Sequence, residues 1–415
     1  MLSPTECAPT QKGMSPTECP LTQKPMSPTE CPPAQKRVVV LGSTGSIGVA
    51  ALEVAAGLGA RVRIVGLAAR SNWQRLAEQA ERWRPAAVAI VEERHYEELR
   101  RAAPAGVKVL AGVDGLVELV ATSEANFVLA AIVGAAGLPA TLAAVERGLD
   151  VGLANKESLV VAGTLLTRLA RERGGRLIPV DSEHSAVFQA LHSGRPSEVR
   201  RIYLTASGGP FRTWTREQME RATLRDALNH PTWDMGPKIT IDSATMMNKA
   251  LEIIEATHLF DVTPEQVEVL VHPESIVHSM VEFCDGSLVA QLSTPDMRTP
   301  IQYALTYPER VEGLAGTVDW RGGRCLTFEP PDVERFPALR LGYEAARRGG
   351  SSGAVLNGAN EAAVERFRAG TVKFPEIARL TEEVLRRHGW VERPTLSELL
   401  EADAWARQEV NACTS

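Results

Sequence analysis

The sequence predicts an α/β protein in three parts: an N-terminal doubly wound domain, a central α+β domain and a C-terminal small helical bundle. Three observations support this prediction. Over residues 37–180, short apolar runs alternate with stretches of helical spacing, which indicates a parallel sheet covered on both faces. A hairpin pattern and one long helical stretch follow in the centre. Residues 333–415 contain four amphipathic stretches in succession, which is typical of a helical bundle.

The N-terminal domain is predicted over residues 37–180. Apolar runs of strand length begin at Val38, and a helix that ends near Gly57 follows the first of them. The other stretches between strands also place apolar residues at helical intervals. Strands are predicted at 38–41, 61–67, 86–91, 107–110, 127–133 and 151–153, and later helices at 138–147 and 158–171.

The central domain is predicted over residues 181–310, and a linker rich in Gly and Pro, residues 311–332, connects it to the C-terminal helical domain. Asp285-Gly286 between two apolar runs indicates a hairpin turn. Strands are predicted at 199–205, 267–271, 276–282 and 288–292, a long helix at 244–259, and C-terminal helices at 339–347, 354–367, 377–388 and 396–410.

Residues 1–36 form a repeat. The segment Ser-Pro-Thr-Glu-Cys begins at Ser3, Ser15 and Ser27, so it recurs every 12 residues. The repeat contains almost no large apolar side chains and therefore cannot bury a core. We expect a disordered extension there; an array of metal-binding cysteines is the less favoured interpretation.

The composition excludes several classes of protein. Of 415 residues, 45 are Lys or Arg and 51 are Asp or Glu, so the net charge of −6 provides no field for nucleic acid. No apolar run approaches the 20 or so residues that span a bilayer, and the polar start lacks the core of a signal peptide. The six cysteines form no CxxC pair, which favours reduced thiols. We expect a cytoplasmic protein with no nucleic-acid or membrane partner.

A glycine-rich loop, Gly42-Ser-Thr-Gly45-Ser-Ile-Gly48, lies between the first predicted strand and the first helix. Gly42 allows a sharp turn, Gly45 lets the backbone approach a pyrophosphate, and Gly48 allows close helix packing. The helix N-terminus adds N–H groups and a positive dipole. In this strand–loop–helix context we favour a Rossmann-type dinucleotide site over a purely structural turn.

The segment that follows the second strand distinguishes between dinucleotides. An NAD site usually has a carboxylate there for the ribose 2′-hydroxyl. This chain instead has Ala69-Arg70-Ser71-Asn72, which offers a guanidinium, a hydroxyl and an amide. That set favours a 2′-phosphate, and hence NADPH, although a solvated turn with an idle arginine is the alternative.

Three carboxylates suggest a metal site. Asp181 and Glu183 follow an apolar strand and would share one face if the strand continued through both. Asn248, Lys249 and Glu252 share one face of the long predicted helix. Three carboxylates without Cys or His partners suit a hard cation such as Mg²⁺ or Mn²⁺. An exposed acidic turn together with a helix ion pair would explain the same residues.

Two further segments fit a phosphorylated ligand. Ser207 precedes two glycines at a strand end, where hydroxyl and backbone donors can meet a phosphate. The loop at 229–238 carries Trp233 and Met235, which either pack on the body or form a lid over a ligand. Lys238–Ile241 is predicted as a short strand that leads into the long helix.

The chain resembles the 1-deoxy-D-xylulose 5-phosphate reductoisomerase family from about Arg37 to Arg407. Seven motifs carry this resemblance and occur in the family's order. They are the glycine-rich loop at 42–48 and the segments at 154–158 (Ala-Asn-Lys-Glu-Ser), 180–184 (Val-Asp-Ser-Glu-His), 206–211, 230–235, 242–249 and 291–300.

The resemblance implies a homodimeric NADPH enzyme of the non-mevalonate isoprenoid pathway. It would rearrange and reduce 1-deoxy-D-xylulose 5-phosphate, a small phosphorylated sugar, to 2-C-methyl-D-erythritol 4-phosphate with Mg²⁺ or Mn²⁺, or with Co²⁺. The resemblance places Trp233 and Met235 on the active-site lid. Arg70 is a departure, because members often have Gly there, and the repeat has no counterpart in the family.

The resemblance also implies roles for individual residues. The catalytic residues would be Lys156, Glu183 and Glu252, and the metal ligands would be Asp181, Glu183 and Glu252. The substrate, largely its phosphate, would contact Lys156, Ser182, Glu183, Ser207, His230, Ser243, Asn248, Lys249 and Glu252. NADPH would contact Thr44, Gly45, Ser46, Ile47, Ala69, Arg70, Ser71, Asn72, Asn155, Glu157 and Gly236.

Two other functions are compatible with the first domain alone. A non-catalytic NADPH-sensing Rossmann protein would need the glycine-rich loop, but it would not need Asp181, Glu183, Lys249 and Glu252 together. A semialdehyde dehydrogenase would need a nucleophilic cysteine at an active-site helix. Cys284 is adjacent to the predicted hairpin turn instead.

Overall fold

A seven-stranded parallel sheet forms the N-terminal part of the protein. The computed structural model describes residues 35–413, so the predicted extension lies outside the described residues except for its last two. The strand order is β4-β3-β2-β1-β5-β6-β7, and the winding therefore reverses between β1 and β5. The strands are β1 (Lys36–Leu41), β2 (Val62–Ala69), β3 (Ala87–Ile90), β4 (Lys108–Ala111), β5 (Phe127–Ala130), β6 (Asp150–Leu153) and β7 (Leu177–Pro179).

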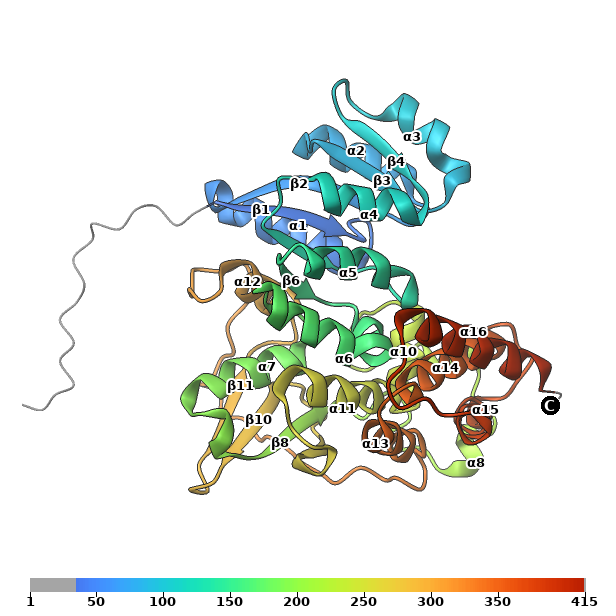
Figure 1. The fold of residues 1–415 in the computed structure, drawn as a ribbon. Coiled ribbons are helices and arrows are strands. Elements are labelled where there is room, and N and C mark those ends of the chain that lie inside the picture. The colour runs from blue at the N-terminus through green and yellow to red at the C-terminus, as the bar shows by residue number, and fades with distance from the viewer. Residues whose placement is uncertain (1–34, 414–415) are drawn as a thin grey trace, which may run out of the picture. The chain divides into compact units, whose positions relative to one another are not determined.

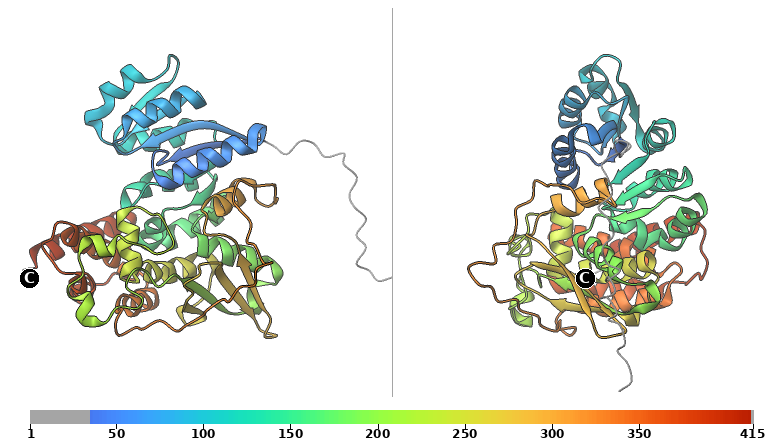
Figure 2. Two further views of the ribbon diagram at one scale, coloured as in Figure 1. Left: turned by 180° about the vertical axis from the view of Figure 1, so that it is seen from behind. Right: turned by 90° about the vertical axis from the view of Figure 1, so that its left-hand side faces the viewer.

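Helices cover both faces of this sheet (Figures 1 and 2), which confirms the doubly wound fold. One face packs against α1 (Ser46–Leu58), α2 (Trp73–Trp83), α3 (Tyr96–Ala102) and α12 (Arg298–Thr306). The other packs against α4 (Gly112–Thr122), α5 (Leu138–Glu146) and α6 (Lys156–Arg173). The sequence did not predict α12, whose Ile301, Ala304 and Leu305 return to the core of the N-terminal sheet.

The glycine-rich loop has the predicted backbone geometry. Gly42 has a φ of 86°, and a Cβ there would lie 2.5 Å from the carbonyl oxygen of Ala131. A Cβ on Gly48 would lie 2.2 Å from the carbonyl oxygen of Gly42, which explains why the first turn of α1 contains a glycine. Gln79 of α2 braces the loop by accepting a hydrogen bond from the Ser43 hydroxyl at 2.7 Å.

A smaller sheet forms the central part of the protein in the order β11-β10-β8-β9. β10 runs antiparallel to β8 and β11, whereas β8 and β9 are parallel. The predicted hairpin at Asp285-Gly286 is confirmed, with β11 as an edge strand. The elements here are α7 (Ser182–Ala190), β8 (Val199–Ala206), α8 (Arg216–Met219), α9 (Leu224–Ala227), β9 (Val267–Val271), β10 (Val277–Phe283) and β11 (Leu288–Leu292).

The segment before the long helix was predicted wrongly. Lys238–Ile241 is not a strand but belongs to α10 (Pro237–Ala244). Proline at the first helical position is already in helical geometry, and Lys238 pairs with Asp242 one turn later. The predicted helix at 244–259 is interrupted, because Met246 has a φ of 61° before α11 (Met247–Phe260) begins.

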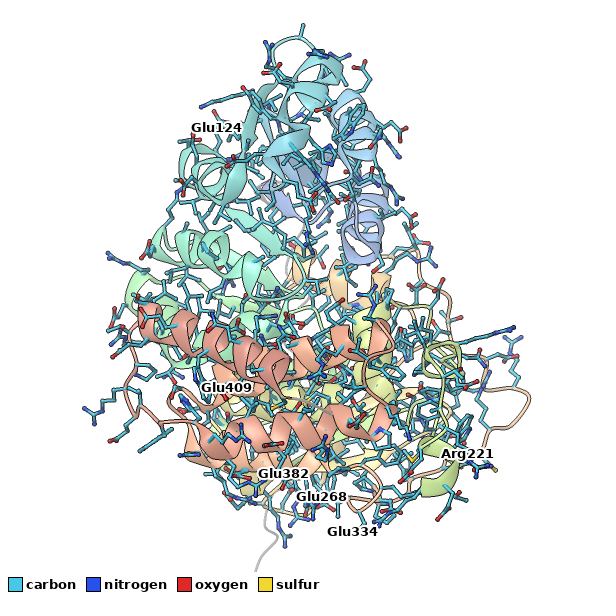
Figure 3. The ribbon with its side chains drawn as sticks, turned by 90° about the vertical axis from the view of Figure 1, so that its right-hand side faces the viewer. Glu124, Arg221, Glu268, Glu334, Glu382 and Glu409 are labelled. Atoms are coloured by element: carbon cyan, nitrogen blue, oxygen red, sulfur yellow. The ribbon has the colours of Figure 1, made fainter. Side chains whose placement is uncertain are left out.

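Four C-terminal helices confirm the predicted bundle: α13 (Ala338–Arg348), α14 (Ser352–Arg368), α15 (Phe374–Arg387) and α16 (Leu396–Ala412). Figure 3 shows Glu382 of α15 and Glu409 of α16 on the outside of these helices, and Glu409 pairs with Arg387 at 3.6 Å. The connection over 307–337 pairs with the central sheet through the bridge between Val271 and Glu329. The domain boundaries at 180, 310 and 332 stay a prediction.

His258 of α11 packs against α6 at a glycine. A Cβ on Gly163 would lie 2.2 Å from Cδ2 of the His258 ring, so the two helices approach closely at this point. Burial lowers the pKa of His258 to about 4, below the ordinary value of 6.5. The imidazole is therefore neutral in the folded protein at neutral pH.

This burial should make the fold sensitive to acid. Between the two pKa values the unfolded chain binds a proton that the folded chain does not, so stability falls as the pH drops through that window. From about pH 7.5 to about pH 5, His258 should remove about 2 kcal/mol from the free energy of unfolding. Urea unfolding at both pH values measures the free energy of unfolding. Its decrease from the higher to the lower pH should be smaller by this amount in His258→Gln than in wild type. Equal losses in the two proteins would mean that the imidazole titrates normally.

Candidate active site

Three elements bring the predicted carboxylates together. β7 ends at Pro179, so the strand does not continue through Asp181 and Glu183, and strand alternation is not what brings them together. Asp181 instead caps α7, where its carboxylate accepts hydrogen bonds from the backbone N–H groups of Glu183 (3.2 Å) and His184 (3.5 Å). Glu252 comes from α11. One carboxylate oxygen from each of Asp181, Glu183 and Glu252 lies within 4.8 Å of the other two.

Lys156, the first residue of α6, is enclosed by this cluster. Its Nζ lies 2.8 Å from Asp181 Oδ2, 2.6 Å from Asn248 Oδ1 and 3.3 Å from Glu252 Oε1. The side chain is only 6% exposed, so water does little to screen these contacts. The ammonium group therefore offsets carboxylate charge directly.

Lys249 offsets the charge from the other side. Its Nζ bonds Glu183, and it bonds Glu252 Oε2 at 2.6 Å. Asn248 completes the cluster by donating to Glu252 Oε1 at 2.6 Å. The structure thus joins three carboxylates and two lysines from α6, α7 and α11.

The cluster separates the pKa values of its carboxyl groups. Burial raises the pKa of Glu252 to about 7, helped by the charge of Glu183 and opposed by Lys249 and Lys156. Burial also disfavours the charge on Asp181, but Lys156 and then His184 hold its pKa well below the usual range. The surroundings therefore favour the charged form of Asp181 and disfavour that of Glu252.

A second group of polar residues surrounds Ser207. His230 Nδ1 accepts hydrogen bonds from the backbone N–H groups of Thr232 (3.1 Å) and Trp233 (2.9 Å), so Nε2 carries the proton and donates to Ser207 Oγ at 2.9 Å. Burial lowers the pKa of His230, which favours this neutral form. The Ser207 oxygen also accepts from Gly209 N–H, so its own proton is directed to another acceptor. The adjoining Gly209 packs against the carbonyl of Ser243 in α10.

Eight of the predicted NADPH residues, Thr44–Ile47 and Ala69–Asn72, lie at the carboxyl ends of β1 and β2. Thr44 to Ile47 form the loop and the first turn of α1, and Arg75 donates to the Thr44 carbonyl at 3.4 Å. Ala69 ends β2. The Arg70 side chain is 80% exposed, and Asn72 caps α2 by accepting from Arg75 N–H at 3.1 Å.

Three family models match successive parts of the chain. The 1-deoxy-D-xylulose 5-phosphate reductoisomerase model matches residues 38–163. A C-terminal domain model of the same enzyme matches 177–260, and a second matches 292–409. Reductoisomerases from Chloroherpeton thalassium and Symbiobacterium thermophilum are 50% and 52% identical over 376 and 377 residues, or 90% of this chain and 97% of each relative.

The chain belongs to the 1-deoxy-D-xylulose 5-phosphate reductoisomerase family. The fold is shared with the reductoisomerase of Zymomonas mobilis in complex with NADPH, at a TM-score of 0.86 and 45% identity over 91% of this chain and 98% of that one. A reductoisomerase in complex with NADPH, fosmidomycin and magnesium gives a TM-score of 0.86 and 39% identity over the same shares.

As a reductoisomerase, the chain is an NADPH-dependent enzyme that converts 1-deoxy-D-xylulose 5-phosphate to 2-C-methyl-D-erythritol 4-phosphate. Membership of this family argues against the two alternative functions, the NADPH-sensing protein and the semialdehyde dehydrogenase. The NADPH-sensing protein would not need the cluster of carboxylates and lysines. Cys284 is exposed in the hairpin between β10 and β11 rather than at an active-site helix.

Sequence reasoning missed the pair formed by His184 and Glu255 beside the reductoisomerase cluster. His184 Nε2 bonds the Glu252 carbonyl at 3.0 Å, and Nδ1 lies 3.3 Å from Asp181 and 3.5 Å from Glu255. Burial would lower the pKa of His184, but Glu255 and Asp181 outweigh it and raise the pKa to about 9. His184 belongs to the motif at 180–184, so the sequence could have indicated it. Glu255 lies in none of the motifs, and only its spacing of three residues from Glu252 on α11 relates it to the site.

Two of the predicted NADPH residues are already engaged within the protein. The side chain of Asn155 caps α6 through Ser158 N–H at 2.7 Å and donates to the Gly134 carbonyl at 2.8 Å. Glu157 is buried and pairs with Lys238 at 2.7 Å. Gly236 caps α10. Direct contact of these three with NADPH stays a prediction.

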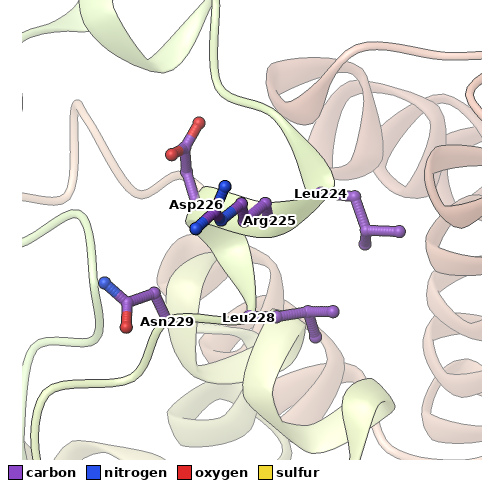
Figure 4. A pocket seen from close by; sticks show the side chains of 5 residues that line it. All are labelled: Leu224, Arg225, Asp226, Leu228 and Asn229. Atoms are coloured by element: carbon purple, nitrogen blue, oxygen red, sulfur yellow. The ribbon is translucent and has the colours of Figure 1, made fainter.

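The loop predicted as a lid lies partly against the body of the protein. Trp233 and Met235 are half-buried, and the Trp233 ring lies 6.2 Å from that of His278. Residues at and just before the start of the loop line an open hollow of about 560 Å³ (Figure 4): Leu224, Arg225, Asp226, Leu228 and Asn229. None of the predicted site residues lines this hollow.

Proposed function

We propose that Asp181, Glu183 and Glu252 hold the divalent cation of the reductoisomerase reaction. Carboxylate oxygens are the ligands that Mg²⁺ and Mn²⁺ prefer, and the 4.8 Å grouping of one oxygen from each residue is the observation that carries this proposal. When bound, the cation supplies a Lewis acid that stabilises negative charge on substrate oxygens. Relatives of known structure hold magnesium.

The two lysines position the substrate around this centre. Lys156 is charged, because Asp181 and Glu252 outweigh burial and raise its pKa, so its ammonium can stabilise an oxygen that gains charge. Lys249 and Asn248 face the same centre from α11. Because the site is largely buried, these groups also keep water away from the reacting carbons.

We assign the substrate's phosphate to the group around Ser207. The fixed tautomer of His230 directs the Ser207 hydroxyl proton outward, and Ser243 lies next to Gly209. Ser182, whose hydroxyl donates to Glu183 Oε2 at 2.5 Å, lies on the metal side of the substrate. Trp233 and Met235 on the loop would cover the bound substrate.

We assign the NADPH 2′-phosphate to Arg70 and Ser71. Replacing them with Asp and Ala should lower kcat/KM for NADPH about a hundredfold more than for NADH, because two charge-assisted hydrogen bonds are lost and a repulsion is added. Arg94→Ala is the matched control, since Arg94 is also largely exposed and pairs with the same Glu92. An unchanged preference in the double variant would assign the 2′-phosphate elsewhere.

We also propose that the enzyme is a cytoplasmic homodimer. The edge strand β11 supports dimerisation, because it exposes Leu288 and Leu292 beside unpaired backbone groups. Among residues 35–413, none of the helices has both the length and the apolar character needed to cross a bilayer. Light scattering on the purified protein measures the assembly; a monomer at micromolar concentration would overturn the dimer.

The assay that tests the function follows NADPH absorbance. Purified protein should oxidise NADPH only when 1-deoxy-D-xylulose 5-phosphate and Mg²⁺ or Mn²⁺ are both present. Oxidation that is independent of the sugar phosphate, or of the cation after treatment with EDTA, would contradict the proposed reaction.

A further inference from the structure

Glu361 of the C-terminal helix α14 reaches the N-terminal sheet. It lies against the loop that follows β5, and a Cβ on Gly134 in that loop would be 3.2 Å from Glu361 Oε1. Gly134 has a φ of 78°, which leaves its backbone open on this side. A carboxylate from the C-terminal helices thus lies at the carboxyl end of the parallel sheet.

The two oxygens of Glu361 have different environments. Oε2 accepts a hydrogen bond from Arg407 of α16 at 2.7 Å, and Arg407 is itself held by Asp403 at 2.6 Å. Oε1 is buried and has no hydrogen-bond partner among the described residues. Leaving a buried carboxylate oxygen unpaired is costly, so such atoms call for an explanation.

Lys238, the cation besides Arg407 that acts electrostatically on Glu361, does not supply the missing donor. Lys238 contributes to the electrostatic surroundings of Glu361, but its Nζ bonds Glu157 at 2.7 Å and Asp242 at 2.9 Å. The Asn155 amide donates instead to the Gly134 carbonyl at 2.8 Å and so fixes the loop. Oε1 is therefore a rigidly held acceptor at a rigid loop.

The sheet topology indicates which ligand would lie beside Glu361 Oε1 and the loop after β5. In a doubly wound sheet the dinucleotide binds outside the carboxyl ends of the strands where the winding reverses, here between β1 and β5. The pyrophosphate lies on the glycine-rich loop after β1, and the adenosine half lies toward β2. The nicotinamide half must then cross the loop after β5, where the Val133 side chain is 70% exposed beside Gly134.

We propose that Glu361 Oε1 accepts a hydrogen bond from the nicotinamide half of NADPH, from a ribose hydroxyl or the carboxamide N–H. The C-terminal helices thereby contribute a cofactor-binding residue to a site built mainly by the N-terminal sheet. The inference rests on the proposed function, since it needs the dinucleotide in the Rossmann-type site. Glu361 lies outside all seven sequence motifs shared with the family.

The test compares two ligands by equilibrium titration, without turnover. Glu361→Met removes both acceptor oxygens at similar side-chain length and should weaken NADPH binding about tenfold. Adenosine 2′,5′-bisphosphate lacks the nicotinamide half, so its Kd should be unchanged. Glu361→Gln keeps one acceptor oxygen and should lie between wild type and Glu361→Met.

Glu365→Met is the matched control, because it removes a carboxylate about one turn further along α14 that is exposed and pairs with Arg368, and its NADPH affinity should equal that of wild type. Equal weakening of both ligands in Glu361→Met, or the same weakening of NADPH binding in Glu365→Met, would overturn the inference and give Glu361 a purely structural role. An unchanged NADPH affinity in Glu361→Met would overturn it too. If wild type itself bound neither ligand, the proposed function would fail instead.

Discussion

Asp181→Asn and Glu252→Gln should each lower turnover about a thousandfold or more, because each removes an anionic ligand from the centre that stabilises developing charge. The fold should survive. Asparagine caps a helix as well as aspartate does, so the start of α7 keeps its two hydrogen bonds. NADPH affinity should change little, since the glycine-rich loop lies on another part of the sheet.

The measurement is turnover across a Mn²⁺ titration, together with melting temperature and NADPH affinity. Glu255→Gln is the matched control: it removes a buried carboxylate one turn further along α11 but leaves the three proposed ligands in place. The Mn²⁺ concentration for half-maximal turnover should therefore stay near the wild-type value in this variant. Near-normal turnover of Asp181→Asn at low Mn²⁺ would remove Asp181 from the ligand set.

Lys156→Met should lower both turnover and stability. The variant loses the ammonium that bonds Asp181, Asn248 and Glu252, so turnover should fall about a hundredfold or more. In EDTA, with no cation bound, only Lys249 would remain to offset the three carboxylates. Removing one partner of a buried ion pair, here Lys156, costs about 3 kcal/mol of stability.

Melting temperatures in EDTA and in Mn²⁺ measure this effect. Mn²⁺ should raise the melting temperature more in Lys156→Met than in wild type, because the bound cation supplies charge that the lysine no longer provides. Lys373→Met, at the exposed start of α15, should behave as wild type in both conditions. If Lys156→Met and wild type had the same melting temperature in EDTA, the lysine would not be needed to balance the charge of the carboxylates.

The first half of the fold was readable from the sequence because its signals are local. The strand before Gly42, the loop and the helix after it each depend on neighbouring residues, and the structure has all three. The segment at Lys238–Ile241 was misread because its two isoleucines alternate like those of a strand. Two features of the same segment predict a helix and outweigh this alternation: Pro237 at the first helical position, and the i,i+4 pair of Lys238 with Asp242.

The site was only partly predictable for a similar reason. The motifs indicated the three carboxylates and both lysines, but the sequence could not show that these groups neutralise one another. It could not reveal Glu255 or Glu361 either, because each acts through contacts between helices that are distant in the chain. The break at Met246 also lacks a sequence signal, since nothing in its neighbours requires a positive φ.

The return of α12 to the N-terminal sheet has a consequence for synthesis of the protein. Ile301 and Ala304 are buried with Val38 and Leu52, so part of the first core is encoded about 250 residues after its first strand. A nascent chain cannot complete this core until residue 306 has left the ribosome. Until then the face that receives α12 stays apolar and uncovered, so it is open to association with other chains.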